Sequence, residues 1–358
     1  MSRNFLWISL FLVFLLRITL YLFFRPDYFE GTKIRLTARV TSEPIRYSSS
    51  QYFRLGNFKI YPPLYPEISY GDEITIEGSY SQGKLKETKL IELNVNNGLL
   101  YRLRKRILGV YEKSLPNRDA ALIAGVALGS KKNIGTEFWE SLKKSGTAHV
   151  VVASGMNITL VAGFLMSFLV TFLPRRRAIG FALVGVWVYS FFAGFDAPIV
   201  RAAFMGTLAF AAQELGRLNL ALKSLFMSFF VILIVKPEWI SDIGFWLSFV
   251  ATLSILILNN RIEAKLKFIK IDFLRKDLAT TTSAQIGVAP IIFATFGQFN
   301  ILSPLINAAV LWTIPLITIL GLFGGLLGLI YVPLGRIILW LSFPLTSYFI
   351  KMVSLLGN

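Results

Sequence analysis

The single histidine of the chain, His149, stands at the start of a long apolar run and close to several small or polar side chains. The run from His149 to Leu173 is long enough to cross a bilayer, where such side chains are unfavourable unless they face protein or water. These side chains belong to Ser154, Gly155, Asn157 and Thr159. We therefore expect the helix to line a polar cavity. The alternative is that small and polar residues let two helices approach closely, as in many membrane bundles.

Asp196 and Arg201 place an acid and a base five positions apart in otherwise apolar sequence. In one interpretation the two form an ion pair that fixes a broken helix. In the other, Arg201 lines a polar cavity, because a permanent charge at membrane depth is costly in contact with lipid.

An enzymatic interpretation has weaker support. His149 and Ser154 could act as base and nucleophile, but five positions put them out of phase on a helix, and no orienting acid is nearby in sequence. The chain has one histidine and no cysteine, which excludes histidine-rich metal sites, thiolate metal sites and disulfides. We therefore predict no enzyme activity, no metal and no cofactor.

Composition indicates a polytopic membrane protein. Hydrophobic residues make up 54% of the 358 positions and charged residues 16%, against about 25% charged residues in soluble domains. The formal net charge is +17, and part of such an excess belongs to cytoplasmic loops that hold the orientation of the helices. Anionic lipid and nucleic acid are both compatible with the remaining charge.

The N-terminal part of the chain contains an apolar run typical of a helix, followed by a segment in which apolar and polar residues alternate. Residues 1–25 form the first expected transmembrane helix, because Phe5–Phe24 is almost continuously apolar. Within residues 30–96, apolar and polar residues alternate in Ile34–Val40 and Glu73–Gly78, with turn signals between such segments. This pattern predicts a small five-stranded barrel of the OB type.

Two groups of basic and aromatic residues could bind a nucleic acid strand. The first group lies in the predicted barrel and comprises Tyr52, Arg54 and Lys59. The second lies in residues 98–145, for which we predict interfacial and short helices, the first of them amphipathic. Its basic residues are Arg102, Arg104, Lys105 and Arg106. The alternative for the barrel is a spacer domain with an ordinary solvated face.

Residues 146–358 are predicted to form a transmembrane domain. A cytoplasmic N-terminus would place the barrel outside and three basic segments inside, as the positive-inside tendency requires. These segments are Arg175–Arg177, Arg217 with Lys223, and Arg261–Lys276. The apolar run 301–331 contains prolines and glycines and could form one kinked span or two short ones.

Four segments of this domain, taken in order, resemble the ComEC family of bacterial competence proteins, inner-membrane channels that pass one strand of transforming DNA into the cytoplasm. Each fragment is short, and it is their order behind a first helix and a barrel-like segment that makes the resemblance strong. The segments are Ser145–His149 with Ala153–Gly155, Ala193–Met205, Gly216–Arg217 with Gly244–Phe249, and scattered positions from Gln285 to Pro315.

The resemblance implies a multi-pass protein of the bacterial inner membrane that conducts single-stranded DNA. The residues assigned to its path are His149, Ser154, Gly155, Asn157, Asp196, Arg201, Ser248 and Gln285. Expected partners are the lipid bilayer, a DNA-receptor protein, a separate nuclease and a cytoplasmic ATPase or helicase. A transporter of a small anionic or lipid-linked substrate is the alternative function.

The sequence departs from the family pattern in places that bear on mechanism. Asn157 stands where a second histidine is frequent, and Trp246 stands where glutamine is frequent. Asparagine keeps donor and acceptor capacity, whereas indole only donates. Members of the family often carry a C-terminal metallo-β-lactamase-like domain. The 358 residues contain neither the histidines nor the length for one, so we expect a short form.

Overall fold

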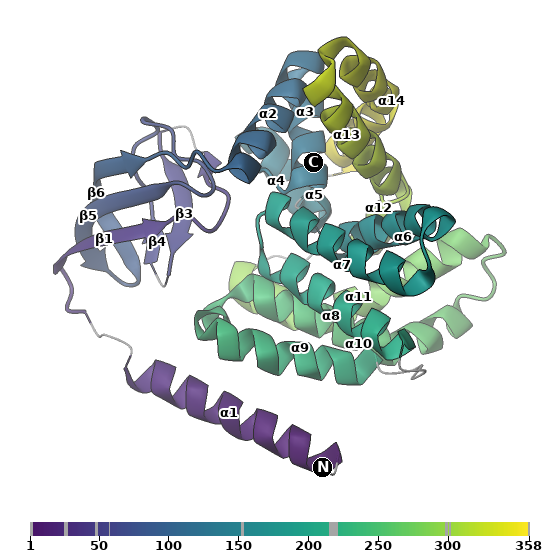
Figure 1. Cartoon of the computed structure of the whole chain (residues 1–358), viewed down its shortest axis with the longest axis horizontal. Coiled ribbons are helices and arrows are strands. Elements are labelled where there is room, and N and C mark those ends of the chain that lie inside the picture. The colour runs from purple at the N-terminus through teal and green to yellow at the C-terminus, as the bar shows by residue number, and fades with distance from the viewer. Residues whose placement is uncertain are drawn as a thin grey trace. The chain divides into compact units, whose positions relative to one another are not determined.

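The computed structural model describes residues 3–24, 28–46, 49–56, 58–151, 154–214, 221–297, 300 and 302–356 (Figure 1). The chain divides into two compact units that alternate along the sequence. Unit 1 contains residues 1–27, 158–188 and 197–308, and unit 2 contains residues 28–157, 189–196 and 309–358. The predicted transmembrane domain, 146–358, is therefore shared between the two units.

An N-terminal sheet belongs to unit 2. Its strands are β1 (Lys33–Arg39), β2 (Ile45–Arg46), β3 (Gln51–Leu55), β4 (Phe58–Ile60), β5 (Glu73–Ser81) and β6 (Lys84–Asn94). They form a curled, six-stranded sheet in the order β1-β5-β6-β4-β3-β2, in which only the β4–β6 pair is parallel (Figure 1). Alternation along the strands turns residues such as Phe53, Ile60 and Ile76 to one face, where they form a buried core.

The helical part of unit 2 packs short helices against two long ones. The helices are α2 (Leu99–Ser114), α3 (Asn117–Leu128), α4 (Thr136–Ser145), α5 (Ala148–Val151), α13 (Thr313–Ile330) and α14 (Val332–Leu356). Glycines on α13 let α2 and α3 approach closely, because an added Cβ at Gly321 would lie 2.8 Å from Ile123 and one at Gly328 would lie 2.5 Å from Val110. The Tyr111 hydroxyl donates to the Gly321 carbonyl at 2.9 Å.

Unit 1 is a bundle of apolar helices. It contains α1 (Arg3–Phe23), α8 (Ala197–Glu214), α9 (Ala221–Val235), the 3-10 helix η1 (Pro237–Ser241), α10 (Ile243–Lys265) and α11 (Asp272–Phe296). Most of α6 (Gly155–Phe172) and α7 (Arg175–Phe192) belongs here as well. Its buried core includes Ile18, Leu233, Phe245 and Phe249.

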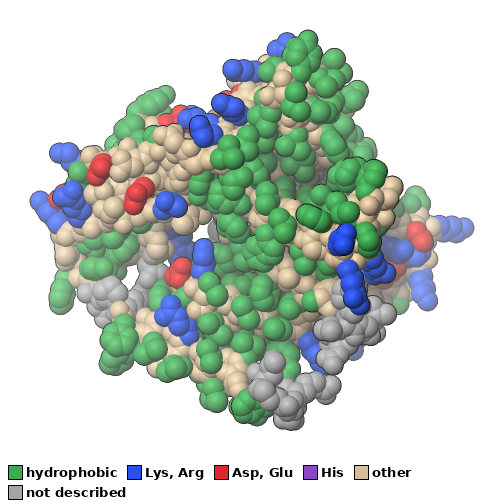
Figure 2. All heavy atoms as spheres, in the orientation of Figure 1, with side chains coloured by type: hydrophobic (Ala, Val, Ile, Leu, Met, Phe, Trp, Pro, Cys, Tyr) green, Lys and Arg blue, Asp and Glu red, His purple; other side chains and the backbone are tan. Residues whose placement is uncertain are grey.

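Within the described residues, five helices are long and apolar enough to cross a membrane: α6, α10, α11 up to Thr295, α13 and α14. Shorter apolar stretches lie in α1, α8 and α9. Many large hydrophobic side chains on these helices are exposed, and Figure 2 shows hydrophobic side chains over much of the visible helical surface. The prediction of a polytopic α-helical membrane protein with a small N-terminal all-β domain is confirmed.

Three details differ from the expectations. The sheet has six strands rather than five, because the two-residue β2 pairs with β3. His149 lies on α5 and the long helix α6 begins at Gly155, so the predicted helix from His149 to Leu173 is not continuous. The run 301–331 is divided into α12 (Ser303–Val310), about 12 Å long and too short to span, and α13.

Candidate functional site

The C-terminus of α3 is a polar site in unit 2. Gly129, in a left-handed conformation with φ 68°, ends the helix, and the amides of Gly129 and Ser130 bond the carbonyls of Gly125 and Ala124. The next three carbonyls each accept from a side chain of another helix. Asn157 Nδ2 donates to the Val126 carbonyl at 2.7 Å, and the Tyr189 hydroxyl donates to the Ala127 carbonyl at 3.0 Å. Arg104 Nη2 donates to the Leu128 carbonyl at 3.1 Å.

Arg104 connects this helix end to the sheet domain. Its Nη2 lies 2.9 Å from Glu43 Oε2, and its Nε donates to the Phe192 carbonyl at 2.8 Å. The Ser130 hydroxyl donates to the other Glu43 oxygen at 2.8 Å. The guanidinium also lies 5.3 Å from the ring centroid of Tyr70, and burial raises the pKa of the Tyr70 hydroxyl, which therefore stays protonated.

The assignment of Arg104 to an exposed DNA-binding surface is wrong. Its exposed fraction is 5% and that of Glu43 is 8%, so both charges are inside the protein and neutralise each other. Arg104 is close in sequence to three other basic residues, but it lies on the buried face of α2. Arg102, Lys105 and Arg106 are exposed on the same helix.

The polar residues around His149 differ in exposure and in hydrogen-bond partners, so they do not form a single polar site. His149 is exposed, and its Nδ1 lies 3.0 Å from the Gly146 carbonyl of the preceding turn. Ser154 and Gly155 are half-buried next to the start of α6. Asn157 is fully buried and bonded to α3, which favours the helix-packing alternative for this residue over the lining of a cavity.

Asp196 and Arg201 have different partners. Asp196 lies 3.3 Å from Lys131 Nζ within unit 2. It follows a tight turn in which Gly194 has φ 96° and Phe195 has φ 50°, an uncommon backbone conformation for a bulky residue. Lys131 is therefore a residue that the sequence analysis missed, because it lies 65 positions away from its acid.

Arg201 forms a polar site inside unit 1. Its Nε donates to the Ser248 hydroxyl on α10 at 2.6 Å, and its Nη1 lies 3.5 Å from Met205 Sδ. The guanidinium is 5.9 Å from the ring centroid of Phe249. None of these recorded partners is acidic, so the cation keeps its charge for another group. Two predicted path residues, Arg201 and Ser248, are thus in direct contact.

Gln285 is a predicted path residue with a separate environment. It is half-buried on α11, and its Nε2 donates to the Asn300 carbonyl at 2.7 Å. Within the described ranges no group of three or more His, Asp or Glu side chains is arranged to hold a metal ion.

The sheet carries a row of three cations on its outer face. Arg54 of β3 is directly opposite Lys59 of β4, which is the register partner of Lys84 on β6. Strands are about 4.8 Å apart, so the three cations lie close together on one face of the sheet. Tyr52 follows on the same face of β3, with its ring centroid 5.0 Å from that of Tyr61.

Lys84 and Tyr61 were absent from the predicted site. A sequence shows which residues alternate along a strand, but not which strand lies beside it. Lys84 joins the row only because β4 and β6 pair in parallel, a connection between residues 25 positions apart. Tyr61 follows Lys59 by two positions, so alternation beyond the end of β4 could have identified it.

The fold and these sites define a multi-pass membrane protein with a sheet domain and, inside the helical bundle of unit 1, an arginine bonded to a serine hydroxyl. The family model described as "Competence protein" matches residues 126–358. The chain belongs to this family, and the resemblance noted in the sequence is confirmed.

Three curated relatives match 57% to 65% of this chain. ComE operon protein 3 of Bacillus subtilis (strain 168) is 25% identical over 234 residues, which is 65% of this chain and 29% of the relative. An uncharacterized protein of Aquifex aeolicus (strain VF5) is 33% identical over 60% of this chain and 49% of its own length. Competence protein ComA of Neisseria gonorrhoeae is 26% identical over 57% of this chain and 30% of its own length. The matched parts therefore span about a third to a half of these relatives. No solved structure matches the chain significantly.

Proposed function

We propose that the protein is an inner-membrane channel that passes single-stranded transforming DNA into the cytoplasm. Membership of the competence protein family supports a role in DNA uptake. The observation that carries the proposal is the row Arg54, Lys59 and Lys84, because three like charges across adjacent strands match a polyanion.

The sheet would receive the strand through phosphate charge and base stacking. Lys59 and Lys84 are exposed, and Tyr61 is 41% exposed beside Tyr52. Aromatic faces stack on any base, so this surface would bind single strands with little dependence on sequence. Arg102, Lys105 and Arg106 on α2 would extend the basic surface.

The salt dependence of binding tests this role. The full-length protein in detergent should bind a fluorescent oligodeoxythymidine with an affinity that falls steeply with salt. Each phosphate contact contributes about 0.7 to the slope of log affinity against log salt for single strands, so Arg54→Gln, Lys59→Gln and Lys84→Gln together should reduce the slope by about 2.

A control variant separates this local effect from a general loss of charge. Lys33→Gln removes one cation from β1, at the opposite side of the sheet order, and should leave the slope unchanged within error. Salt-independent binding, or an equal effect of Lys33→Gln and Lys59→Gln, would refute a role for the cation row.

Arg201 and Ser248 are the proposed contact for DNA phosphate within the helical bundle. A guanidinium whose recorded partners are a hydroxyl, a thioether and a ring can still bind an anion. The driving force would come from a cytoplasmic ATPase or helicase, since the sequence contains no phosphate-binding loop of the Gly-x-x-x-x-Gly-Lys-Ser/Thr type. A DNA-receptor protein and a separate nuclease are further proposed partners.

For the orientation, we propose a cytoplasmic N-terminus and an extracytoplasmic sheet domain. Arg175–Arg177 and Arg261–Lys276 then lie on the cytoplasmic side, together with Lys223 and with Arg217, which is outside the described residues. Single cysteines introduced into this cysteine-free chain at Ser50 and Arg176 should react with an impermeant reagent from opposite faces. Reaction of both from one face would contradict this topology.

Transport of a small anionic or lipid-linked substrate is the alternative, because the Arg201–Ser248 pair could bind any such anion. Uptake of one small solute by vesicles that contain the protein, in the absence of DNA and unaffected by it, would favour this alternative.

A further inference from the structure

The connection between α10 and α11 has a surface that the proposed channel function does not use. Both helices are candidate membrane spans, with 23 and 25 residues, and only Leu266–Ile271 joins them. At 1.5 Å per residue, α10 is about 34 Å long and α11 about 37 Å, which exceeds the hydrocarbon thickness of about 30 Å. The connection and the adjoining helix ends, residues 260–276, are named here the α10–α11 tip. The tip must lie close to a membrane surface.

Large apolar side chains of the tip are exposed between lysines. Phe268 is 76% exposed, Ile271 63% and Phe273 58%. The exposed lysines in the same segment are Lys265, Lys267, Lys270 and Lys276. Exposed apolar groups interleaved with cations are typical of segments that insert into the headgroup layer, where the apolar parts reach the acyl chains and the amines meet anionic headgroups.

Arg275 gives the tip a defined shape. Its Nη2 lies 2.6 Å from Asp272 and its Nε 3.5 Å from Glu263, while its Nη1 lies 3.4 Å from the Ile269 carbonyl. One guanidinium therefore contacts both carboxylates of the tip, and the other five cations of residues 260–276 outnumber the one negative charge that remains. The lysines retain their charge for an external anion.

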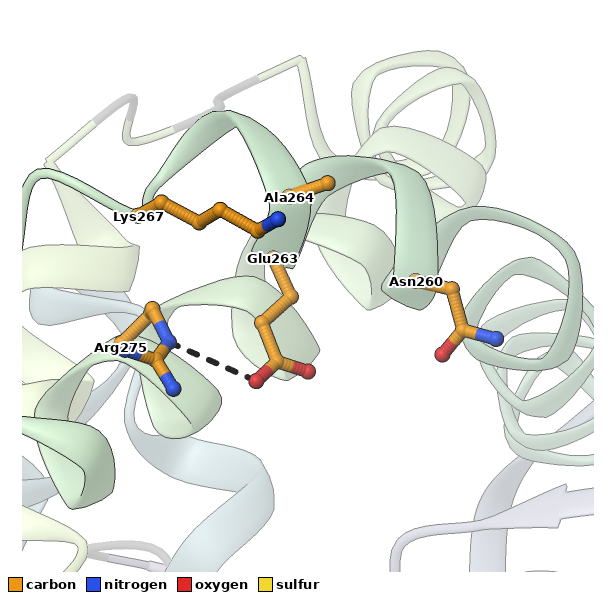
Figure 3. Close-up of a pocket in the computed structure, with 5 residues that line it drawn as sticks. All are labelled: Asn260, Glu263, Ala264, Lys267 and Arg275. Atoms are coloured by element: carbon orange, nitrogen blue, oxygen red, sulfur yellow. Dashed lines mark ion pairs between the residues drawn. The ribbon is translucent and has the colours of Figure 1, made fainter.

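A cleft of about 530 Å³ opens beside this ion pair and is lined by Asn260, Glu263, Ala264, Lys267 and Arg275 (Figure 3). In Figure 3, Lys267 extends from the connection over Glu263 and Ala264, and Asn260 lies at the other end. Within the described chain the structure records no ion pair for Lys267, so its amine is available to a phosphate that enters the cleft.

We infer that the α10–α11 tip is a binding site for anionic phospholipid, with Phe268, Ile271 and Phe273 in the headgroup layer and a lipid phosphate next to Lys267. Lipid fits better than the alternatives, a nucleic acid strand or an acidic protein, because the two spans hold the tip at the bilayer and an exposed isoleucine gains little from stacking on bases.

The depth of a label on the tip tests this inference. The full-length protein with Ile271→Cys carries one cysteine, which is labelled with a nitroxide and reconstituted in vesicles of phosphatidylcholine, alone or mixed with phosphatidylglycerol. Phosphatidylglycerol should lower the accessibility of the label to an aqueous nickel chelate present on both sides and raise its accessibility to oxygen. A label at Tyr65→Cys, a 72% exposed position of the sheet domain, should remain accessible to nickel in both vesicles.

Variants that remove lysines test whether the charge of the tip causes its response to phosphatidylglycerol. Each lysine near an anionic surface should contribute about fivefold to the preference for it, so Lys265→Gln, Lys267→Gln and Lys270→Gln together should reduce the preference for phosphatidylglycerol by about a hundredfold, with Lys276 left in place. The same change at Lys33, Lys86 and Lys89 of the sheet should not. A label at Ile271 that is as accessible to nickel as the Tyr65 label in both vesicles would overturn the inference. Protection by an added oligonucleotide, but not by phosphatidylglycerol, would also overturn it and assign the tip to nucleic acid.

Discussion

Two arginines in apolar surroundings, Arg104 in unit 2 and Arg201 in unit 1, have different partners. Arg104 has a carboxylate, two carbonyls and a tyrosine ring, and its charge is balanced inside the protein. Arg201 has a hydroxyl, a thioether and a phenylalanine ring, and its charge is not balanced by these groups. A balanced buried cation holds structure, whereas an unbalanced one can bind an anion.

The C-terminus of α3 explains the buried side chains of Arg104, Asn157 and Tyr189. The end of α3 is inside the protein, where unpaired carbonyls would be costly. Side chains from α2, α6 and α7 bond these carbonyls, and a cation at a helix C-terminus is favourable to the helix dipole. Asn157 and Arg104 were both assigned to DNA, and the structure uses both to complete a helix end.

The largest expected effect comes from breaking the buried ion pair. Arg104→Met should destabilise the protein by about 3 to 5 kcal/mol, because Glu43 is left charged and unpaired in the interior. Thermal unfolding of the purified full chain measures the change. Arg102→Met alters an exposed arginine of the same helix and should cost about 0.5 kcal/mol or less.

A double variant sharpens this prediction. Adding Glu43→Gln to Arg104→Met removes the unpaired charge, so the double variant should recover part of the lost stability. The interpretation fails if Arg104→Met unfolds at the same temperature as Arg102→Met.

The second effect concerns transport rather than stability. Arg201→Leu should insert and fold normally, yet reduce DNA uptake by about tenfold or more, equivalent to about 1.4 kcal/mol. Arg201→Lys should retain part of the activity, since it keeps the point charge and loses the bidentate fork. Uptake by cells that depend on this chain, compared at equal protein level, measures the effect. Uptake by Arg201→Leu at the unmodified rate would make Arg201 a packing residue and remove it from the proposed route.

The sequence predicted the helices and strands better than it predicted which side chains contact each other in the fold. Long apolar runs and strand alternation identified the spans and the sheet, because these patterns depend on local periodicity. Arg201 could be assigned to a polar site since a charge at membrane depth must have partners. The role of Arg104 could not be inferred in this way. Its carboxylate lies 61 positions earlier in the chain and its carbonyl acceptor Phe192 lies 88 positions later, so only the tertiary fold brings them together.

The smallest expected effect comes from Tyr189, whose hydroxyl bonds one carbonyl at the end of α3. Tyr189→Phe keeps the ring and removes the donor, so the Ala127 carbonyl loses its side-chain partner at a cost of about 1 kcal/mol. Tyr331→Phe removes a hydroxyl from a 61% exposed ring and should change stability by about 0.5 kcal/mol or less. Thermal unfolding of both variants provides the comparison. If Tyr189→Phe matches Tyr331→Phe, the helix end tolerates an unbonded carbonyl, and the structural role assigned to this cluster would then rest on Arg104 and Asn157.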